Sequence, residues 1–356
     1  MEENKPLAPF TTFGIGGPAR WFVEASSERE IVEATAWARE RGLALFVLGG
    51  GSNLLVSDDG FDGLVLKVGL RGGDRVEAQE GGGQIVYRVA AGEDWDGFVE
   101  RTVQDGCAGI ECLAGIPGTV GGTPVQNVGA YGQEVASVIE RVRVVDLQLE
   151  TFAEFPAEEC GFGYRRSRFN SADRGRYIVT RVDYRLAPGG APTLGYADLQ
   201  RAVAETYGEG SRPSLAEVAA VVRRVRQSKG MLLVEGDPDC RSAGSFFKNP
   251  IVTEEQVRRI EECSGRKPPC FVAGAQSTGL LKLPAAWLIE QAGFQKGYRL
   301  GAAGISRRHT LALVNLGGGL GGAKAAEILA LAEKIEAAVE GRFGIQLEME
   351  PVMVGF

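Results

Sequence analysis

Histidine is almost absent from this sequence: only His309 occurs among 356 residues. A nucleophilic serine usually depends on a histidine that removes its proton, so the composition argues against a hydrolase with a Ser-His-Asp triad. The six cysteines form no C-x-x-C pair, which argues against a structural zinc site, and we expect no metal and six reduced thiols. No apolar run is long enough to cross a bilayer.

An export signal and a basic surface are also missing. The first ten residues, MEENKPLAPF, are acidic and contain no apolar segment, so we expect a cytoplasmic protein. The formal net charge of -7 argues against a general binder of nucleic acid or of membrane surfaces, but it leaves room for a local basic pocket. With 44% hydrophobic and 24% charged residues, the chain has the composition of a globular protein with two or three cores.

Glycine, by contrast, is abundant, with 51 residues. The glycines at 81–83 stand between two strand-like segments and predict a hairpin turn. Those at 317–322 predict a connector into a last helix, whose apolar stripe begins at Ile328 and whose end we place at Gly341. The remaining glycine clusters are not explained by simple turns.

Capping signals and hydrophobic periodicity predict the regular elements. The predicted helices begin at Ser27, near Trp95, and at Ser214, Thr253 and Pro284, and the predicted strands cover residues 43–48, 141–145 and 181–186. The break at residues 188–192, rich in proline and glycine, is our candidate linker. We therefore expect a strand-rich first half and a mixed second half.

The first unexplained glycine cluster is Gly49-Gly50-Gly51-Ser52-Asn53, directly after a predicted strand. Glycines let successive backbone N–H groups turn toward an anion, and the next two side chains add donors, so the loop suits a pyrophosphate; a tight turn is the alternative. It is no P-loop, because no Gly-Lys-Ser/Thr follows. The stretch 14–18 is no dinucleotide fingerprint either, because Pro18 stands where a helix should begin.

A second glycine-rich stretch covers residues 114–132. No helix or long strand accommodates so many glycines together with two prolines, and loops of this length in a compact domain are usually functional. Two such loops suggest one large ligand.

The segment Ser-Ala-Gly-Ser-Phe-Phe-Lys-Asn-Pro, residues 242–250, raises a question of chemistry. It places Ser245 between small residues and two phenylalanines that can keep water away. With one histidine in the chain to activate it, this hydroxyl is either structural or itself gives up a proton.

Six segments in this order closely resemble the UDP-N-acetylenolpyruvoylglucosamine reductase family. They are Thr12-Phe-Gly-Ile-Gly-Gly, Leu48-Gly-Gly-Gly-Ser-Asn, Gly115-Ile-Pro-Gly-Thr-Val-Gly-Gly, Gln126-Asn-Val-Gly-Ala-Tyr-Gly, Gly161-Phe-Gly-Tyr-Arg and Ala243-Gly-Ser-Phe-Phe-Lys-Asn-Pro. The resemblance implies an α+β fold: a two-lobed FAD-binding region of the vanillyl-alcohol oxidase type in residues 1–210, with lobes of about 1–70 and 71–210, and an α/β substrate-binding domain in 211–356.

The resemblance also implies an activity. The family consists of cytosolic bacterial flavoenzymes that use NADPH and FAD to reduce the enolpyruvyl ether of UDP-N-acetylglucosamine, giving UDP-N-acetylmuramate for peptidoglycan. We expect noncovalent FAD, because neither glycine loop offers a histidine to attach it. The expected partners are this substrate and NADPH, without nucleic acid or membrane, and we expect a monomer.

Three catalytic residues follow from the matched motifs. Ser245 matches the proton donor, and Arg165 matches an active-site arginine whose planar fork suits a carboxylate that becomes an enolate. Glu350 matches a third, charge-organising group, with Glu348 as its rival, and Pro351 replaces the usual aliphatic residue. A structural serine and a solvated strand arginine are the alternatives for the first two.

The resemblance also assigns ligand contacts. The implied FAD contacts are Gly49, Gly50, Gly51, Ser52, Asn53, Gly115, Pro117, Gly118, Thr119, Gly121, Gly122, Asn127, Gly129, Ala130 and Tyr131. The implied substrate contacts are Tyr164, Tyr196, Lys229, Asn249 and His309. Tyr196 matches a mobile loop of one subclass, a lysine suits a diphosphate as a point charge, and a lone histidine is also compatible with a structural role.

Two other functions are compatible with parts of the sequence. A different FAD enzyme on the same scaffold, such as an oxidase of a hydroxy acid or sugar alcohol, would explain the glycine loops, but not the joint presence of Ser245, Arg165 and Glu350. A non-catalytic nucleotide-binding protein is the more distant alternative, and it predicts no flavin absorption band.

Overall fold

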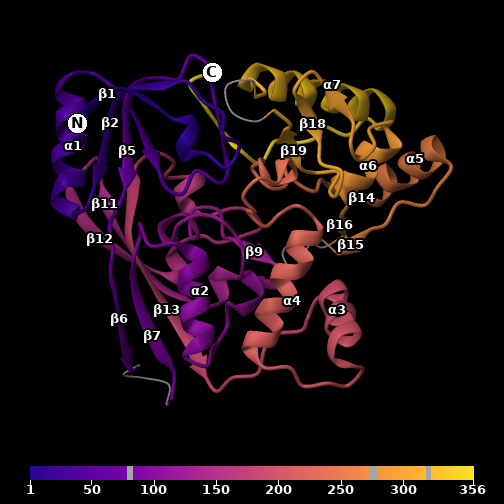
Figure 1. Ribbon diagram of the computed structural model, residues 1–356, viewed down its shortest axis with the longest axis horizontal. Helices are drawn as coiled ribbons and strands as arrows, with labels where there is room; N and C mark the ends of the chain where they lie inside the picture. Colours follow the sequence, from indigo (N-terminus) through magenta and orange to yellow (C-terminus); the bar gives the residue numbers. More distant parts are fainter. Residues whose placement is uncertain (78–82, 273–278, 318–321) are drawn as a thin grey trace. The chain divides into compact units, whose positions relative to one another are not determined.

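The computed structural model describes residues 1–77, 83–272, 279–317 and 322–356. The chain forms two compact units, each assembled from separate stretches (Figure 1). The first unit contains residues 1–5, 19–51 and 62–228, and the second contains 6–18, 52–61 and 229–356. We predicted a boundary after residue 210, whereas these units divide after Ser228. The difference arises because Val218 and Val222 pack into the core of the first unit.

The first unit contains a four-stranded sheet with the order β1-β2-β5-β3, and β3 runs parallel to β5. Its strands are β1 (Glu2–Pro6), β2 (Pro18–Ala25), β5 (Phe61–Val68) and β3 (Ala44–Leu48). Helix α1 (Glu28–Glu40) precedes β3, and the Ser27 side chain accepts the Glu30 N–H, as its capping signal predicts. This part of the sequence prediction is confirmed.

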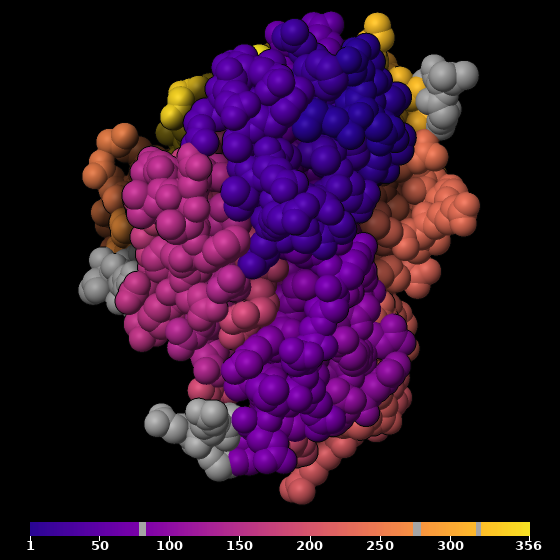
Figure 2. All heavy atoms as spheres, turned by 90° about the vertical axis from the view of Figure 1, so that its left-hand side faces the viewer, coloured from indigo at the N-terminus to yellow at the C-terminus, as the bar shows by residue number. Residues whose placement is uncertain are grey.

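The second sheet of the first unit is antiparallel, with the order β12-β11-β13-β7-β6. Its strands are β12 (Thr151–Pro156), β11 (Ile139–Asp146), β13 (Tyr177–Pro188), β7 (Ile85–Ala90) and β6 (Gly73–Glu77). The pairing of β6 with β7 confirms the predicted hairpin, although most of its glycine turn lies outside the described residues. Figure 2 shows a face of this unit, where the indigo N-terminal segment lies beside magenta residues of the β11–β12 region.

Three helices complete the first unit: α2 (Trp95–Gln104), α3 (Ala197–Tyr207) and α4 (Leu215–Ser228). The prediction did not include α3. The candidate linker at 188–192 is wrong as an interdomain connection, because both of its flanks belong to this unit. β13 pairs through Pro188 with β8 (Cys107–Ala108), and a Cβ on Gly190 would lie 2.9 Å from the Ala108 Cβ.

The second unit joins strands from distant parts of the chain. β4 (Leu54–Val56) pairs in parallel with β20 (Val352–Val354). One three-stranded sheet contains β14 (Ile251–Thr253), β16 (Leu280–Lys282) and β15 (Phe271–Val272), and another contains β17 (Arg299–Leu300), β18 (Ala303–Ile305) and β19 (Leu313–Asn315). The helices are α5 (Glu254–Ser264), α6 (Ala285–Gln291) and α7 (Ala325–Phe343).

Helix α7 ends later than the sequence predicted. The glycine at 341 lies inside the helix, and Gly344, with a φ of 65°, terminates it in the left-handed conformation. The last turn is retained because Phe343 is buried in the core of the second unit. Within the described parts of the chain, no helix is long and apolar enough to span a membrane.

Candidate active site

The two glycine loops meet in the first unit. A Cβ on Gly50 would lie 2.5 Å from the Gly118 Cα, and a Cβ on Gly49 would lie 3.0 Å from the Thr119 Oγ1. Only a residue without a side chain allows the backbone at Gly50 to approach so closely. At the point where the loops meet, the backbone is not covered by side chains. A site that binds a pyrophosphate through backbone N–H groups needs this property, so this part of the chain fits the phosphates of FAD.

The second glycine loop is held in place from several sides. The Asp96 carboxylate accepts the Gly115 N–H at 2.6 Å, and the Arg226 Nε donates to the Gly115 carbonyl at 3.0 Å. The Gly118 carbonyl accepts the N–H of Trp95 at 3.1 Å. Residues of helices α2 and α4 thus hold the loop in place.

Three residues of this region adopt the left-handed backbone conformation that glycine favours. They are Asn127, Tyr131 and Arg165, with φ angles of 45°, 50° and 52°. The Arg165 guanidinium donates to the Gly129 carbonyl at 3.2 Å, which joins the arginine to the second glycine loop. Such conformations cost about 1–3 kcal/mol each and concentrate at functional sites, so their grouping here supports a binding role.

Three tyrosines lie at this loop, and two of them, Tyr164 and Tyr196, are exposed. The Tyr131 and Tyr196 rings contact edge to face, with 5.9 Å between their centroids, and 45% of Tyr196 is exposed immediately before α3. Tyr164, on the Arg165 turn, is 41% exposed. Burial raises the pKa of both Tyr131 and Tyr196, so these phenols stay neutral at pH 7.

In the second unit, the Ser245 segment runs beside Glu350. The Glu350 N–H donates to the Phe246 carbonyl at 2.8 Å, and Phe247 bridges Met349 in antiparallel fashion. Both phenylalanines are buried, with their ring centroids 5.4 Å apart. The structure therefore brings two of the three predicted catalytic segments together, while Arg165 belongs to the other unit.

The two candidate glutamates differ in their contacts. Glu348 forms an ion pair with Lys248, and 71% of its side chain is exposed. The Glu350 carbonyl accepts the Asn53 side-chain N–H at 3.2 Å, and the Asn53 carbonyl accepts the Val352 N–H at 2.9 Å. Asn53 thus holds the Glu350 segment by its side-chain amide, which we had expected to bind an anion. These contacts favour Glu350 over Glu348.

His309 lies among cations of the second unit. Burial, reinforced by the charges of Lys229 and Lys296, lowers the pKa of His309 to about 4. Its Nδ1 accepts the Leu311 N–H at 3.1 Å, so the neutral ring carries its proton on Nε2. Two of the predicted substrate contacts, Lys229 and His309, are therefore near each other, and the charge of Lys296 acts on the same ring.

Asn249 is already engaged by the fold. Its side-chain oxygen accepts the Ala285 N–H at 2.9 Å, which satisfies the first turn of α6. Its amide N–H₂ is the part of the side chain that can donate to an anion. Among the described residues, no cluster of three or more His, Cys, Asp or Glu side chains could hold a metal ion.

Comparisons with known proteins place these features in a family. Residues 237–354 match the model of the UDP-N-acetylenolpyruvoylglucosamine reductase C-terminal domain, and residues 19–151 match an FAD binding domain. Two curated relatives carry the name UDP-N-acetylenolpyruvoylglucosamine reductase. The protein of Thermobifida fusca is 44% identical over 99% of this chain and 97% of its own length, and that of Streptomyces coelicolor is 44% identical over 99% and 90%. The chain belongs to the UDP-N-acetylenolpyruvoylglucosamine reductase family.

A solved structure of the same reductase family, from Thermus caldophilus, is similar along the whole chain. It is 28% identical, with a TM-score of 0.65, and the match covers 99% of this chain and 98% of that one. The expected α+β fold with an FAD-binding region is therefore confirmed, and the chain is an oxidoreductase with an FAD-binding domain.

Arg226 was not among the site residues predicted from the sequence. This arginine is 9% exposed, and burial lowers its pKa, reinforced by the charge of Arg165 and opposed by Tyr131 and by the charge of Asp96. A signal was present: Val218, Val222 and Arg226 follow at four-residue spacing, so an arginine interrupts the apolar stripe of α4. Two guanidinium groups therefore stand close to the second glycine loop.

Proposed function

We propose that this protein uses NADPH and noncovalently bound FAD to reduce UDP-N-acetylglucosamine enolpyruvate to UDP-N-acetylmuramate, a cytoplasmic step of peptidoglycan precursor synthesis. The observation that carries the proposal is the pairing of the Ser245 segment with Glu350 through the Glu350 N–H and the Phe246 carbonyl. This pairing supports the family's activity because a hydroxyl and a carboxylate lie on adjacent segments beside two buried aromatic rings.

The reaction requires a proton donor and an anion stabiliser. Bound FAD would supply the hydride, taken from NADPH, to the methylene carbon of the enolpyruvyl group. Negative charge then spreads into the substrate carboxylate as an enolate, and the neighbouring carbon needs a proton. Ser245 gives this proton, since a neutral hydroxyl needs no prior ionisation. Glu350 organises the charge around that transfer.

Arg165 stabilises the carboxylate end of the substrate as it gains charge. Its guanidinium is oriented by the hydrogen bond to the Gly129 carbonyl, and a planar fork matches the two oxygens of a carboxylate. Arg226 adds a second positive charge nearby. A preorganised positive site of this kind lowers the energy of the enolate, which carries an additional negative charge, more than that of the enol ether with its single carboxylate charge.

The UDP portion is bound by polar side chains. Lys229 contacts the diphosphate, and Asn249 and the Nε2–H of His309 donate hydrogen bonds to it. Tyr196 closes over the UDP portion, consistent with its exposure, and Tyr164 contacts the substrate beside Arg165. The protein acts as a monomer, without nucleic acid or membrane partners.

Rapid mixing of the two half-reactions tests this function. Reduction by NADPH needs no proton from Ser245, so Ser245→Ala should lose flavin absorbance at nearly the wild-type rate. Reoxidation by UDP-N-acetylglucosamine enolpyruvate should slow by about 10²- to 10⁴-fold, as expected when a general acid is lost. Ser245→Cys retains a donor and should recover part of that rate.

The outcomes separate the alternatives. Wild-type protein that is reduced by NADPH but not reoxidised by the enolpyruvyl substrate would indicate a different flavoenzyme on this scaffold. An alanine variant that reoxidises at the wild-type rate would end the role of Ser245 as donor. A variant that loses flavin or slows equally in both half-reactions would show that Ser245 is structural.

A further inference from the structure

The turn that carries Arg165 has a conformation that arginine rarely adopts. The N–H and carbonyl of Gly163 bond to the carbonyl and N–H of Arg166 at 2.9 and 3.1 Å, so Tyr164 and Arg165 are the two central residues of a tight turn. Arg165 has a φ of 52°, and Tyr164 is not among the positive-φ residues. A turn with positive φ only at its second central residue normally has glycine or asparagine there.

The Asn170 side chain bonds to the backbone of this strained residue. The Asn170 Nδ2 donates to the Arg165 carbonyl at 3.2 Å, and the Asn170 Oδ1 accepts the Ser167 N–H at 2.9 Å. A single amide thus bonds to both ends of the short loop around Arg166. The two bonds use the donor and the acceptor of asparagine in fixed order, and no carboxylate can supply both.

The ends of the turn are anchored separately. On one side, the Asn127 Nδ2 donates to the Gly163 carbonyl at 3.0 Å, and Asn127 is 2% exposed. On the other, the fully buried Ser167 donates its hydroxyl to the Val125 carbonyl at 2.6 Å. These anchors fix where the turn lies on the glycine loop. Asn170 bonds directly to the Arg165 backbone.

We propose that Asn170 is a positioning residue: its amide keeps Arg165 in the left-handed conformation that directs the guanidinium toward the Gly129 carbonyl and the substrate. This inference rests on the proposed function for the part that concerns substrate. The conformational part does not depend on it. Without this bond the Arg165 backbone can relax to negative φ, and a change of that dihedral moves the guanidinium away from its place on the glycine loop.

A stability cycle tests the conformational part without any activity measurement. Glycine adopts a φ of 52° without strain, so Arg165→Gly needs no restraint from Asn170. We expect Asn170→Ala to lower the melting temperature by about 2–4 °C in the wild-type background and by clearly less in the Arg165→Gly background. Equal losses in the two backgrounds would overturn the proposal.

Half-reaction kinetics test the functional part. Asn170→Asp keeps the acceptor for Ser167 but loses the donor to Arg165, so reoxidation by UDP-N-acetylglucosamine enolpyruvate should slow at least 10-fold, while reduction by NADPH stays within two-fold of wild type. In an Arg165→Ala background the same change should alter reoxidation less than two-fold, because there is no guanidinium to place. Asn4→Asp, the same substitution at an exposed left-handed residue, serves as the control and should leave both rates unchanged.

The two arms distinguish the possible failures. If wild-type protein is not reoxidised by the enolpyruvyl substrate, the proposed function fails, and the stability cycle still decides whether Asn170 holds Arg165. If the wild type is reoxidised and Asn170→Asp reoxidises equally fast, the positioning role is wrong. Additive effects of the Asn170 and Arg165 substitutions on reoxidation would contradict it as well.

Discussion

His309 combines burial, two neighbouring lysines and a backbone donor at Nδ1, and all three oppose a positive charge on its ring. We expect its pKa to be about 4 in the folded protein. Because the sequence contains one histidine, a single Hε1 resonance in proton NMR reports the titration. Lys229→Met removes one of the charges and should raise the midpoint toward 6.5, and a wild-type midpoint near 6.5 would contradict the arrangement.

The same shift gives stability a pH dependence with a definite sign. The unfolded chain binds a proton at His309 near pH 6.5 and the folded chain near pH 4. The contribution of the neutral ring is therefore fully present above pH 6.5 and is lost as the pH falls through 4. The melting temperature of His309→Asn should accordingly fall less between pH 7 and pH 4 than that of the wild type.

The position of Gly50 in the loop after β3 leads to a testable prediction. Gly50→Ala would put a Cβ 2.5 Å from the Gly118 backbone, which must shift. We expect the free energy of unfolding to fall by about 1–3 kcal/mol, together with weaker FAD binding. Thermal unfolding and flavin absorbance measure the two effects.

The matched control is the same substitution inside α7. Gly341 lies inside α7, and a Cβ added there would meet no heavy atom within 4 Å apart from its own stretch of helix backbone. Gly341→Ala should therefore raise the free energy of unfolding by about 0.5–1 kcal/mol. The obstacle to a side chain at Gly50 is the backbone of the neighbouring loop at Gly118. Unchanged stability and flavin content in Gly50→Ala would refute this packing.

Local signals predicted most elements, and their failures have physical causes. The capping residues Ser27 and Thr253 located the starts of α1 and α5, because a side-chain cap is a short-range interaction. The end of α7 was wrong because two glycines compete for the terminating position, and burial of Phe343 extends the helix to the second one. Helix α3 was missed because the Tyr196 segment was interpreted only as a loop.

The organisation of the chain into units could not be predicted from local pattern. Residues 6–18 and 52–61 join the second unit because β4 pairs with β20 at the other end of the chain. The same long-range pairing places Glu350 beside Asn53. The catalytic candidates came from a family resemblance, whereas the contacts of Arg226 and Asn170 required the structure, since a side-chain bond between distant segments leaves no periodic signal.

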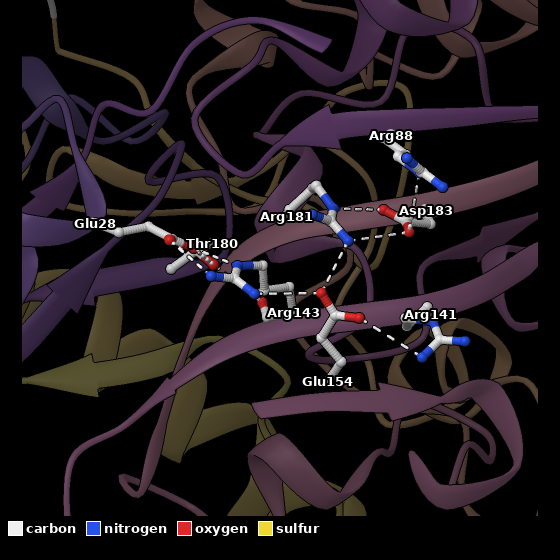
Figure 3. A network of polar contacts seen from close by, with 8 residues as sticks. All are labelled: Glu28, Arg88, Arg141, Arg143, Glu154, Thr180, Arg181 and Asp183. Carbon is white, nitrogen blue, oxygen red and sulfur yellow. Dashed lines mark hydrogen bonds and ion pairs between the residues drawn. The ribbon is translucent and has the colours of Figure 1, made fainter. Parts of the chain in front are cut away.

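A network of polar contacts in the first unit includes Glu28, Arg143 and Thr180 (Figure 3). Arg143 donates from Nε and Nη2 to the two Glu28 oxygens at 2.8 and 3.1 Å, and the Thr180 hydroxyl donates to Oε1 at 2.6 Å. These bonds join the first turn of α1 to β11 and β13. The hydrogen bond from Arg143, opposed by burial, lowers the pKa of Glu28 below its ordinary value of 4.5.

A lowered carboxylate pKa stabilises the fold above pH 4.5, and the effect is lost as the pH falls through the folded value. Glu28→Gln keeps the shape but removes the charge, so at pH 7 it should lower the free energy of unfolding by about 1 kcal/mol. The difference from wild type should shrink as the pH falls through the lowered folded pKa of Glu28, because the carboxyl then becomes neutral like the amide. Glu33, which pairs with Arg29 on the exposed face of α1, is the control: Glu33→Gln should change stability by less than about 0.5 kcal/mol at either pH. Denaturant unfolding at the two pH values decides the point, since a deficit in Glu28→Gln that persists at low pH would mean that packing, and not charge, joins the helix to the sheet.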